Sequence, residues 1–294
     1  MIDHEVMPES RVDGNGFSGM LRYRSILRRY PVISVMVLLS VLVSAIFAHW
    51  LAPYDPLLPV LSNRLMAPDS TFIMGTDSMG RDVLSRLIYG SRTTGIVVSL
   101  SLLVGTGSGL ILGLVAGYFG DVVDAVVSRL IDTFLAFPGL FFGLLFAATF
   151  GPSVLTLVAA MSIVLWAGTA RIIRAETLAT KNREYIDSAI VSGASRTRII
   201  FRHLLPNVIP TFVVILSLTV GGVILGEAAL SFLGAGVPLP SSSWGSMITE
   251  GQRFLERAWW IAIPPGMAIT LTVLAVNLFG DWMRDYLDPK LRQI

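Results

Sequence analysis

The sequence predicts an all-α integral membrane protein with six transmembrane helices, and three observations support this fold class. Hydrophobic residues make up 53% of the 294 residues and charged residues only 14%, against roughly 25% charged in a typical soluble protein. Several long stretches contain no Asp, Glu, Lys or Arg. These stretches are long enough to cross a bilayer, which takes about 20 apolar residues in a helix. A soluble globular domain and a disordered chain are therefore both poor matches.

The first uncharged stretch covers 31–51, and as a helix it would reach roughly 30 Å, which is one bilayer core. A cleaved signal peptide is the alternative. However, this stretch exceeds the usual apolar region of roughly 7–15 residues, and no A-x-A cleavage site follows it. We expect 1–29 to be a cytoplasmic tail and 30–52 to be a peripheral transmembrane anchor.

Residues 53–92 are predicted to form an external loop with an interfacial helix. An amphipathic pattern begins near Val83, and Thr76 or Asp77 could cap a helix there. We expect this helix to lie along the membrane surface before it turns into span two. Capping is the expected role of Asp77 and Asp82, and docking of an external partner is the alternative. The polar side of the pattern carries Arg81, Asp82, Arg86 and Arg92.

The remaining spans follow from the other uncharged stretches. Residues 93–117 give span two, whereas 133–170 is too long for one helix. Gly151-Pro152 divides that stretch, so we expect a hairpin of two spans over 131–150 and 153–171. Spans five and six are predicted over 208–236 and 258–279. Together these spans make a five-helix permease core over 93–282, with a tail at 283–294.

The orientation follows from the basic residues, which are enriched on the cytoplasmic side of membrane proteins. With six spans, sixteen of the 22 Lys and Arg residues fall on the side that carries both termini. Both termini are therefore expected in the cytoplasm, in a multi-pass arrangement. Seven of those sixteen lie in 171–203.

The segment 171–203 is predicted to hold a short helix between two spans. Asn182 could cap this helix and Gly193 could end it, while Ser195 could cap the next one. Its apolar face would carry Ile186, Ala189 and Ile190. Two interpretations carry equal weight at this point: a helix that enters a socket on a cytoplasmic partner, and a basic loop on anionic lipid headgroups.

Glycines and one carboxylate stand out within the spans. Glu227 is the only carboxylate well inside a predicted span, so it must face protein or water. A hydrogen bond between helices is its first interpretation, and a place on the transport pathway is the second. The glycines that recur every fourth residue predict faces for close helix packing. They are Gly105, Gly109, Gly113 and Gly117 in span two, and Gly222 and Gly226 in span five.

The sequence contains no motif that indicates enzyme chemistry. Neither lysine follows a glycine, so no Walker A motif is present. The three histidines are scattered, there is no cysteine, and no serine lies in a G-x-S-x-G elbow. The net charge of +2 does not indicate nucleic acid. If the chain transports a solute, a partner must supply the energy.

Several parts of the sequence resemble known transport proteins. Asp187-Ser188-Ala189, Gly193 and Leu205-Pro206 resemble the EAA loop of permease subunits in binding-protein-dependent ABC importers, with the same spacing. Asp187 and Ser188 replace the usual Glu and Ala. Further blocks resemble the C-type permease of dipeptide, oligopeptide and nickel importers, and lie at 51–56, 75–82, 224–234, 243–245 and 277–289.

The resemblance implies an ABC type I importer permease fold with a cytoplasmic coupling helix. It also implies four kinds of partner: a B-type permease in a heterodimer, two cytoplasmic ATPase subunits, an external solute-binding protein and the lipid bilayer. ATP and Mg would bind the ATPases, and this chain would bind no cofactor or metal. The implied location is the bacterial inner membrane. The implied ATPase-coupling residues are Arg183, Glu184, Tyr185, Ile186, Asp187, Ser188, Ala189, Gly193, Ala194 and Ser195.

The expected function is thus translocation of peptides or a related small solute, powered by separate ATPases. The alternative is a secondary transporter driven by an ion gradient, which would use charge pairs within the membrane and inverted repeats. The sequence indicates neither feature.

Overall fold

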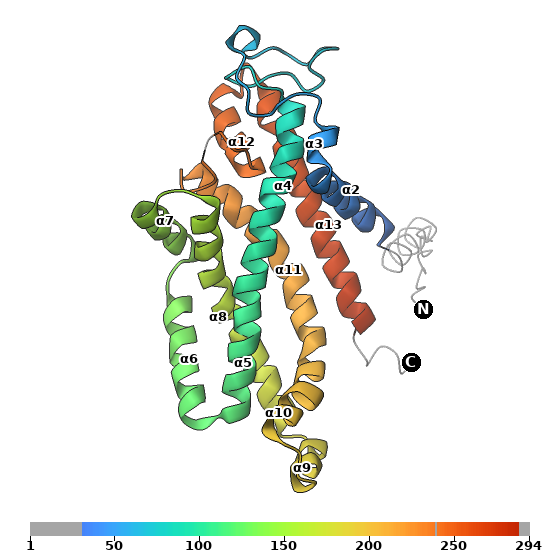
Figure 1. Cartoon of the computed structure of the whole chain (residues 1–294), viewed down its shortest axis with the longest axis vertical. Coiled ribbons are helices and arrows are strands. Elements are labelled where there is room, and N and C mark those ends of the chain that lie inside the picture. The colour runs from blue at the N-terminus through green and yellow to red at the C-terminus, as the bar shows by residue number, and fades with distance from the viewer. Residues whose placement is uncertain (1–30, 239, 288–294) are drawn as a thin grey trace, which may run out of the picture.

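The computed structural model describes residues 31–238 and 240–287, and its regular elements in these ranges are all helices (Figure 1). Long helices run along the long axis of the molecule. The segment before α4 and the helix α12 lie at one end, and α9 lies at the opposite end. The predicted tail 1–29 and the last part of the predicted tail 283–294 lie outside the described residues.

The first described helix is shorter than the predicted anchor. It runs as α2 (Val32–Ile46), breaks at Phe47 and resumes as α3 (Ala48–Leu51). Its 15 residues fall below the length of a full span. The helix nevertheless packs against α4 and α13, so it is attached to the bundle.

The predicted interfacial helix does not exist as a separate element. α4 (Val83–Ser101) continues through a π-helical turn (Leu102–Thr106) into α5 (Gly107–Phe119), which makes one stretch of 37 residues. No proline interrupts it, so nothing forces the expected turn into span two. Asp82 caps this helix, since its side chain accepts a hydrogen bond from the Ser85 backbone N–H at 2.8 Å. Neither Thr76 nor Asp77 has that role.

The prediction of a single straight span over 131–150 is also wrong. α6 (Asp121–Ala136) and α7 (Gly139–Phe150) meet at an angle of 83°. Phe137 and Pro138 are both extended at this break, because proline disfavours helical conformation in the residue before it. The break at Gly151-Pro152 lies where it was predicted, and α8 then starts with Ser153 as its cap.

Four helical stretches in the described residues are long and apolar enough to cross a membrane, and the bent α6–α7 pair raises this number to five. These four are Val83–Phe119, Val154–Lys181, Arg196–Phe232 and Trp259–Tyr286. Three of these stretches contain helices whose bounds have not yet been given, and two further helices lie between them. In chain order these helices are α8 (Val154–Lys181), α9 (Glu184–Val191), α10 (Arg196–Ile199), α11 (Leu205–Phe232), α12 (Trp244–Gly251) and α13 (Ile263–Leu287).

Four glycines place α5 and the preceding turn in close contact with α8. A Cβ atom added to Gly109 would lie 2.6 Å from the Trp166 carbonyl oxygen, and one on Gly113 would lie 2.8 Å from the Ala170 oxygen. Gly105 and Gly117 are equally crowded by residues of α8. Each of these contacts is too short for a real side-chain carbon, so the two backbones could not approach this closely with any larger residue.

The second packing face, expected at Gly222 and Gly226 of α11, is less crowded than the glycine face of α5. A Cβ atom on Gly222 would meet no atom within 4 Å, and one on Gly226 would meet only the flexible end of the Met161 side chain, at 3.3 Å from its sulfur. The reason is rotational: α11 turns Gly221 towards α13, so Gly222 is carried about 100° away from that contact.

Replacing Gly109 by alanine should destabilise the protein, because the added methyl group would overlap the α8 backbone. We expect a loss of about 1–3 kcal/mol, measured as a lower thermal midpoint of the purified complex in detergent. Gly107→Ala is the matched control, since a Cβ atom there meets nothing within 4 Å. Equal midpoints for the two variants would contradict this packing.

Candidate functional site

The candidate site is the end of the molecule formed by residues 183–202, here called the tip. In Figure 1 the tip lies at the bottom, beyond the ends of the long helices α5, α8 and α11. It connects α8 to α11, so any movement of the tip acts directly on two candidate membrane helices.

The chain enters the tip through a short break after α8. Asn182 ends α8, and Arg183 adopts an extended conformation before α9 starts. The prediction that Asn182 caps α9 is therefore wrong, and α9 has no side-chain cap. Two acidic residues in its first turn, Glu184 and Asp187, lie where the helix dipole favours negative charge.

The chain leaves α9 through Gly193, as the sequence indicated. Its φ angle of +78° is a left-handed conformation that glycine adopts without strain. The Gly193 N–H donates to the Ile190 carbonyl oxygen at 2.9 Å, and the Ala194 N–H donates to that of Ala189 at 3.0 Å. These bonds close the helix end. Ser195 then caps α10 by accepting a hydrogen bond from the Arg198 N–H at 3.3 Å.

One isoleucine anchors α9 to the ends of the long helices. Ile186 is fully buried, in a hydrophobic cluster with Ile173 of α8 and Leu114 of α5. The same cluster includes Ile199, Leu204 and Val208 from the start of the next long helix. The inner side of α9 therefore belongs to a hydrophobic cluster to which all three helices that end at the tip contribute.

The outer side of the tip combines exposed apolar residues with exposed arginines. Val191 is 89% exposed and Phe201 is 68% exposed, and Tyr185 and Ile190 are also exposed. Asp187 and Ser188 are exposed too, and Asp187 forms no ion pair among the described residues. Four arginines at the tip are exposed, namely Arg183, Arg196, Arg198 and Arg202. Exposed apolar groups ringed by charge are typical of a protein interaction site.

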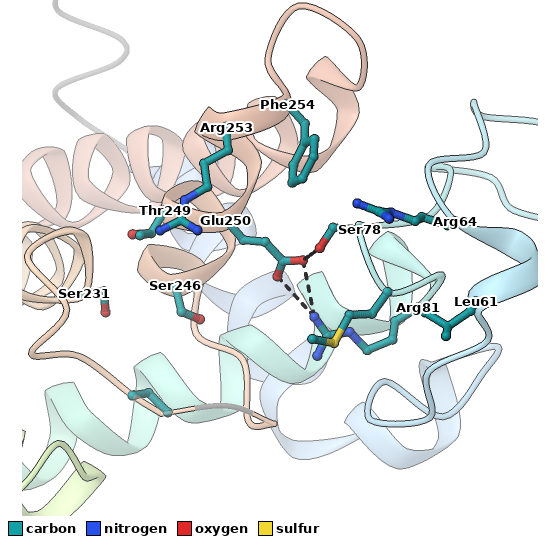
Figure 2. A pocket seen from close by; sticks show the side chains of 12 residues that line it. Leu61, Arg64, Ser78, Arg81, Ser231, Ser246, Thr249, Glu250, Arg253 and Phe254 are labelled. Atoms are coloured by element: carbon teal, nitrogen blue, oxygen red, sulfur yellow. Dashed lines mark hydrogen bonds and ion pairs between the residues drawn. The ribbon is translucent and has the colours of Figure 1, made fainter.

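The opposite end of the molecule holds a buried charge network that the sequence analysis missed. Asp77 accepts from Arg81 Nε at 2.7 Å and also pairs with Arg86. Glu250 of α12 accepts from Arg81 Nη2 at 3.1 Å (Figure 2). It also accepts from Arg86 Nη1 at 2.8 Å. The two arginines and two carboxylates balance in charge. From the sequence, Arg81 and Arg86 were expected only on the polar side of an interfacial helix, because no local pattern links them to a carboxylate about 165 residues away.

Glu227 connects α11 to the start of α12. It is fully buried, and its Oε1 accepts hydrogen bonds from Ser231 at 2.8 Å and from Ser243 at 2.6 Å. Ser243 is the cap of α12. α12 is therefore held at both ends: its cap Ser243 binds Glu227 of α11, and its own Glu250 binds Arg81 and Arg86.

Two ion pairs join α6 to α8 on the side of the tip. Arg171 Nη2 lies 2.5 Å from Asp132 Oδ1, and Arg174 pairs with Asp124 through both carboxylate oxygens. The sequence alone had indicated no charge pairs within the membrane, so these two pairs between α6 and α8 were not anticipated. Within the ranges that the structure describes, no group of three or more His, Asp or Glu side chains could hold a metal ion.

Comparison with known proteins identifies relatives over most of the chain. The family model for the binding-protein-dependent transport system inner membrane component matches residues 109–293. The chain is 38% identical to the di/tripeptide transport system permease protein DppC of Pseudomonas aeruginosa, over 88% of this chain and 87% of that protein. It is 38% identical to the glutathione transport system permease protein GsiD of Pectobacterium atrosepticum, over 92% and 90% of the two chains. It is 36% identical to the probable D,D-dipeptide transport system permease protein DdpC of Escherichia coli, over 88% and 87%.

Glu250→Gln should lower the stability of this end of the molecule, because Arg81 and Arg86 would keep their buried charges with one carboxylate fewer. We expect a loss of about 2 kcal/mol, less than the roughly 3–5 kcal/mol of a fully buried pair because water reaches Glu250. The thermal midpoint of the purified complex measures this. Glu256→Gln, at an exposed position on the same segment, should change the midpoint little, and a drop of equal size there would contradict the role of the network.

Proposed function

The chain belongs to the family of binding-protein-dependent transport system inner membrane components, and we propose that it moves short peptides or a related small solute across the bacterial cytoplasmic membrane. It is a transport permease subunit of ABC importers and not an enzyme. The proposal of a peptide rests on relatives whose names specify dipeptides, di/tripeptides and D,D-dipeptides.

The proposed membrane arrangement has six spans with both termini in the cytoplasm. α2 with α3 would be the peripheral anchor of 30–52, and the bent α6–α7 pair would count as one span of the 93–282 core. The tip would face the cytoplasm, because 16 of the 22 basic residues fall on that side. The segment 53–82 and α12 would then face outwards.

The proposed role of the coupling loop 171–206, which contains the tip and has α9 as its coupling helix, is to bind an ATPase subunit. The observation that carries this proposal is the two-sided character of α9. Ile186 ties its inner side to α5, α8 and the start of α11, while Val191 and Ile190 leave its outer side free for a partner. A short helix held in this way would pass a rigid-body movement of the ATPase into α8 and α11.

The proposed assembly contains a B-type permease subunit as a heterodimer partner, two cytoplasmic ATPases and an external solute-binding protein. ATP and Mg would bind the ATPases, with no cofactor on this chain. The proposed role of Glu227 is structural, because its hydrogen bond with Ser243 orients the start of α12 while Ser231 of α11 holds the same carboxylate oxygen. Gly222 and Gly226 of α11 stay candidates for contact with the second permease.

Two alternatives have specific support. A basic loop on anionic headgroups would account for the four exposed arginines of the tip. A secondary transporter would use charge pairs, and the Arg171–Asp132 and Arg174–Asp124 pairs are of that kind. Both pairs are partly exposed and lie between α6 and α8 alone, which favours a role in joining these helices.

Gly193→Asp should leave the protein in the membrane but separate ATP hydrolysis from uptake, because aspartate at a φ of +78° would shift the end of α9. Reconstituted importer would then hydrolyse ATP while accumulating several-fold less solute per ATP. Ser192→Asp adds the same charge at an exposed neighbour with an ordinary φ of −74° and should keep coupling. Normal coupling in the Gly193→Asp importer would refute the assignment of this segment.

Val191→Asp should weaken association with the ATPases, since it puts a charge on the most exposed apolar side chain of the tip. We expect an ATPase pair to co-purify with the unaltered permease in mild detergent and about tenfold less with this variant. Thr197→Asp, at an exposed polar position of the tip, is the control. Solute transport by this chain alone in liposomes would instead support the secondary transporter.

A further inference from the structure

A cavity of about 540 Å³ opens at the outer end, between the segment before α4, the end of α11 and α12 (Figure 2). This volume lies in the range of sites that enclose small molecules, roughly 300–1,000 Å³. The cavity is separate from the tip, and nothing in the proposed coupling mechanism uses it.

The charges that line the cavity do not cancel. Three arginines line it, Arg64, Arg81 and Arg253, against the single carboxylate of Glu250. Glu250 is already occupied, because it accepts hydrogen bonds from Ser78 at 2.5 Å and from both arginines of the buried network. The surplus positive charge therefore belongs to Arg64 and Arg253.

These two arginines have no partner among the described residues, and both are exposed. They come from different segments, one beside the turn Leu61–Asn63 and the other from the turn after α12. Between them, Arg81 is 2% exposed and fixed by Asp77 and Glu250, yet its Nη1 donates to no described residue. The cavity thus combines one rigid guanidinium with two free ones.

The rest of the lining combines apolar and hydroxyl-bearing residues. Leu61, Met79, Val237 and Phe254 line the cavity together with Ser78, Ser231, Ser246 and Thr249. A molecule that suits this surface carries one carboxylate and an apolar portion. Guanidinium groups bind carboxylates with charge-assisted and often paired hydrogen bonds.

We propose that this cavity is an entry site that binds the terminal carboxylate of a short peptide on the outer side of the permease. The inference deepens the proposed function and rests on it, because the peptide is the solute class taken from that proposal. The carboxylate would lie among Arg64, Arg81 and Arg253, with the peptide side chain against the apolar lining.

The test uses the complete importer in nanodiscs without its binding protein, and two photoreactive probes. The first is alanyl-photoleucine with a free carboxylate, and the second is the same dipeptide as its carboxyl-terminal amide. After illumination, mass spectrometry locates the adducts. We expect the free acid to label the cavity segments 61–81 and 231–254 about tenfold more than the amide, since only the acid offers a charged acceptor.

The variant Arg64→Gln with Arg253→Gln should lower labelling by the free acid about tenfold. Both side chains are exposed, so the variant should elute as intact complex in size-exclusion chromatography. The matched control is Arg92→Gln with Arg257→Gln, two exposed arginines of the outer end that do not line the cavity, and it should label within about twofold of the unaltered complex.

Two outcomes would overturn the inference. They are equal labelling by acid and amide, and labelling that the double variant leaves unchanged. If the double variant labels normally but binds the solute-binding protein more weakly in a separate binding assay, the cavity is instead a socket for an acidic side chain of that protein. Dipeptide uptake by proteoliposomes with binding protein and ATP separates the cavity site from the proposed function: uptake with equal labelling refutes only the cavity site, whereas absent uptake refutes the peptide as the solute.

Discussion

The close contact between α5 and α8 is the constraint on which the rest of the structure depends. α8 runs from the Gly151-Pro152 break to the tip, and it carries α9 at its end. Glycines let the α5 backbone lie against it, where Gly109 and Gly113 leave no room for a larger residue. In lipid the hydrophobic effect does not hold helices together, so close van der Waals contact has to do so. This contact fixes α8, and with it the start of the tip, against α5.

The two ends use charge in opposite ways. At the outer end, Asp77 and Glu250 neutralise Arg81 and Arg86 within the protein, which fixes α12 against the start of α4. At the tip, the arginines remain exposed beside Val191 and Phe201. A buried and balanced network holds a structure in one arrangement, because breaking it would leave a charge without a partner. An exposed and unbalanced surface is suited to meeting a partner that supplies the missing contacts.

α12 belongs both to the buried charge network and to the lining of the cavity. Glu227 holds its first residue through Ser243, and Glu250 near its other end belongs to the buried network. Between these anchors, α12 provides one wall of the cavity that we assign to the peptide carboxylate. An outer wall held at both ends keeps the cavity in a defined shape, so that solute recognition does not require the wall to order first.

The sequence by itself determined the all-α membrane class, the break at Gly151-Pro152 and the end of α9 at Gly193. Each of these depends on local chemistry: uncharged length, proline, and the left-handed conformation that glycine permits. Local patterns did not reveal that α4 continues unbroken into α5, that α6 and α7 meet at 83°, or that Gly222 faces away from α13. Local patterns also did not reveal that Arg86 pairs with Glu250, or that two arginines of the cavity, Arg64 and Arg253, have no such partner among the described residues. Tertiary structure decided these features, because pairing, helix rotation and cavity shape depend on residues that are distant in the chain and adjacent only after the helices pack.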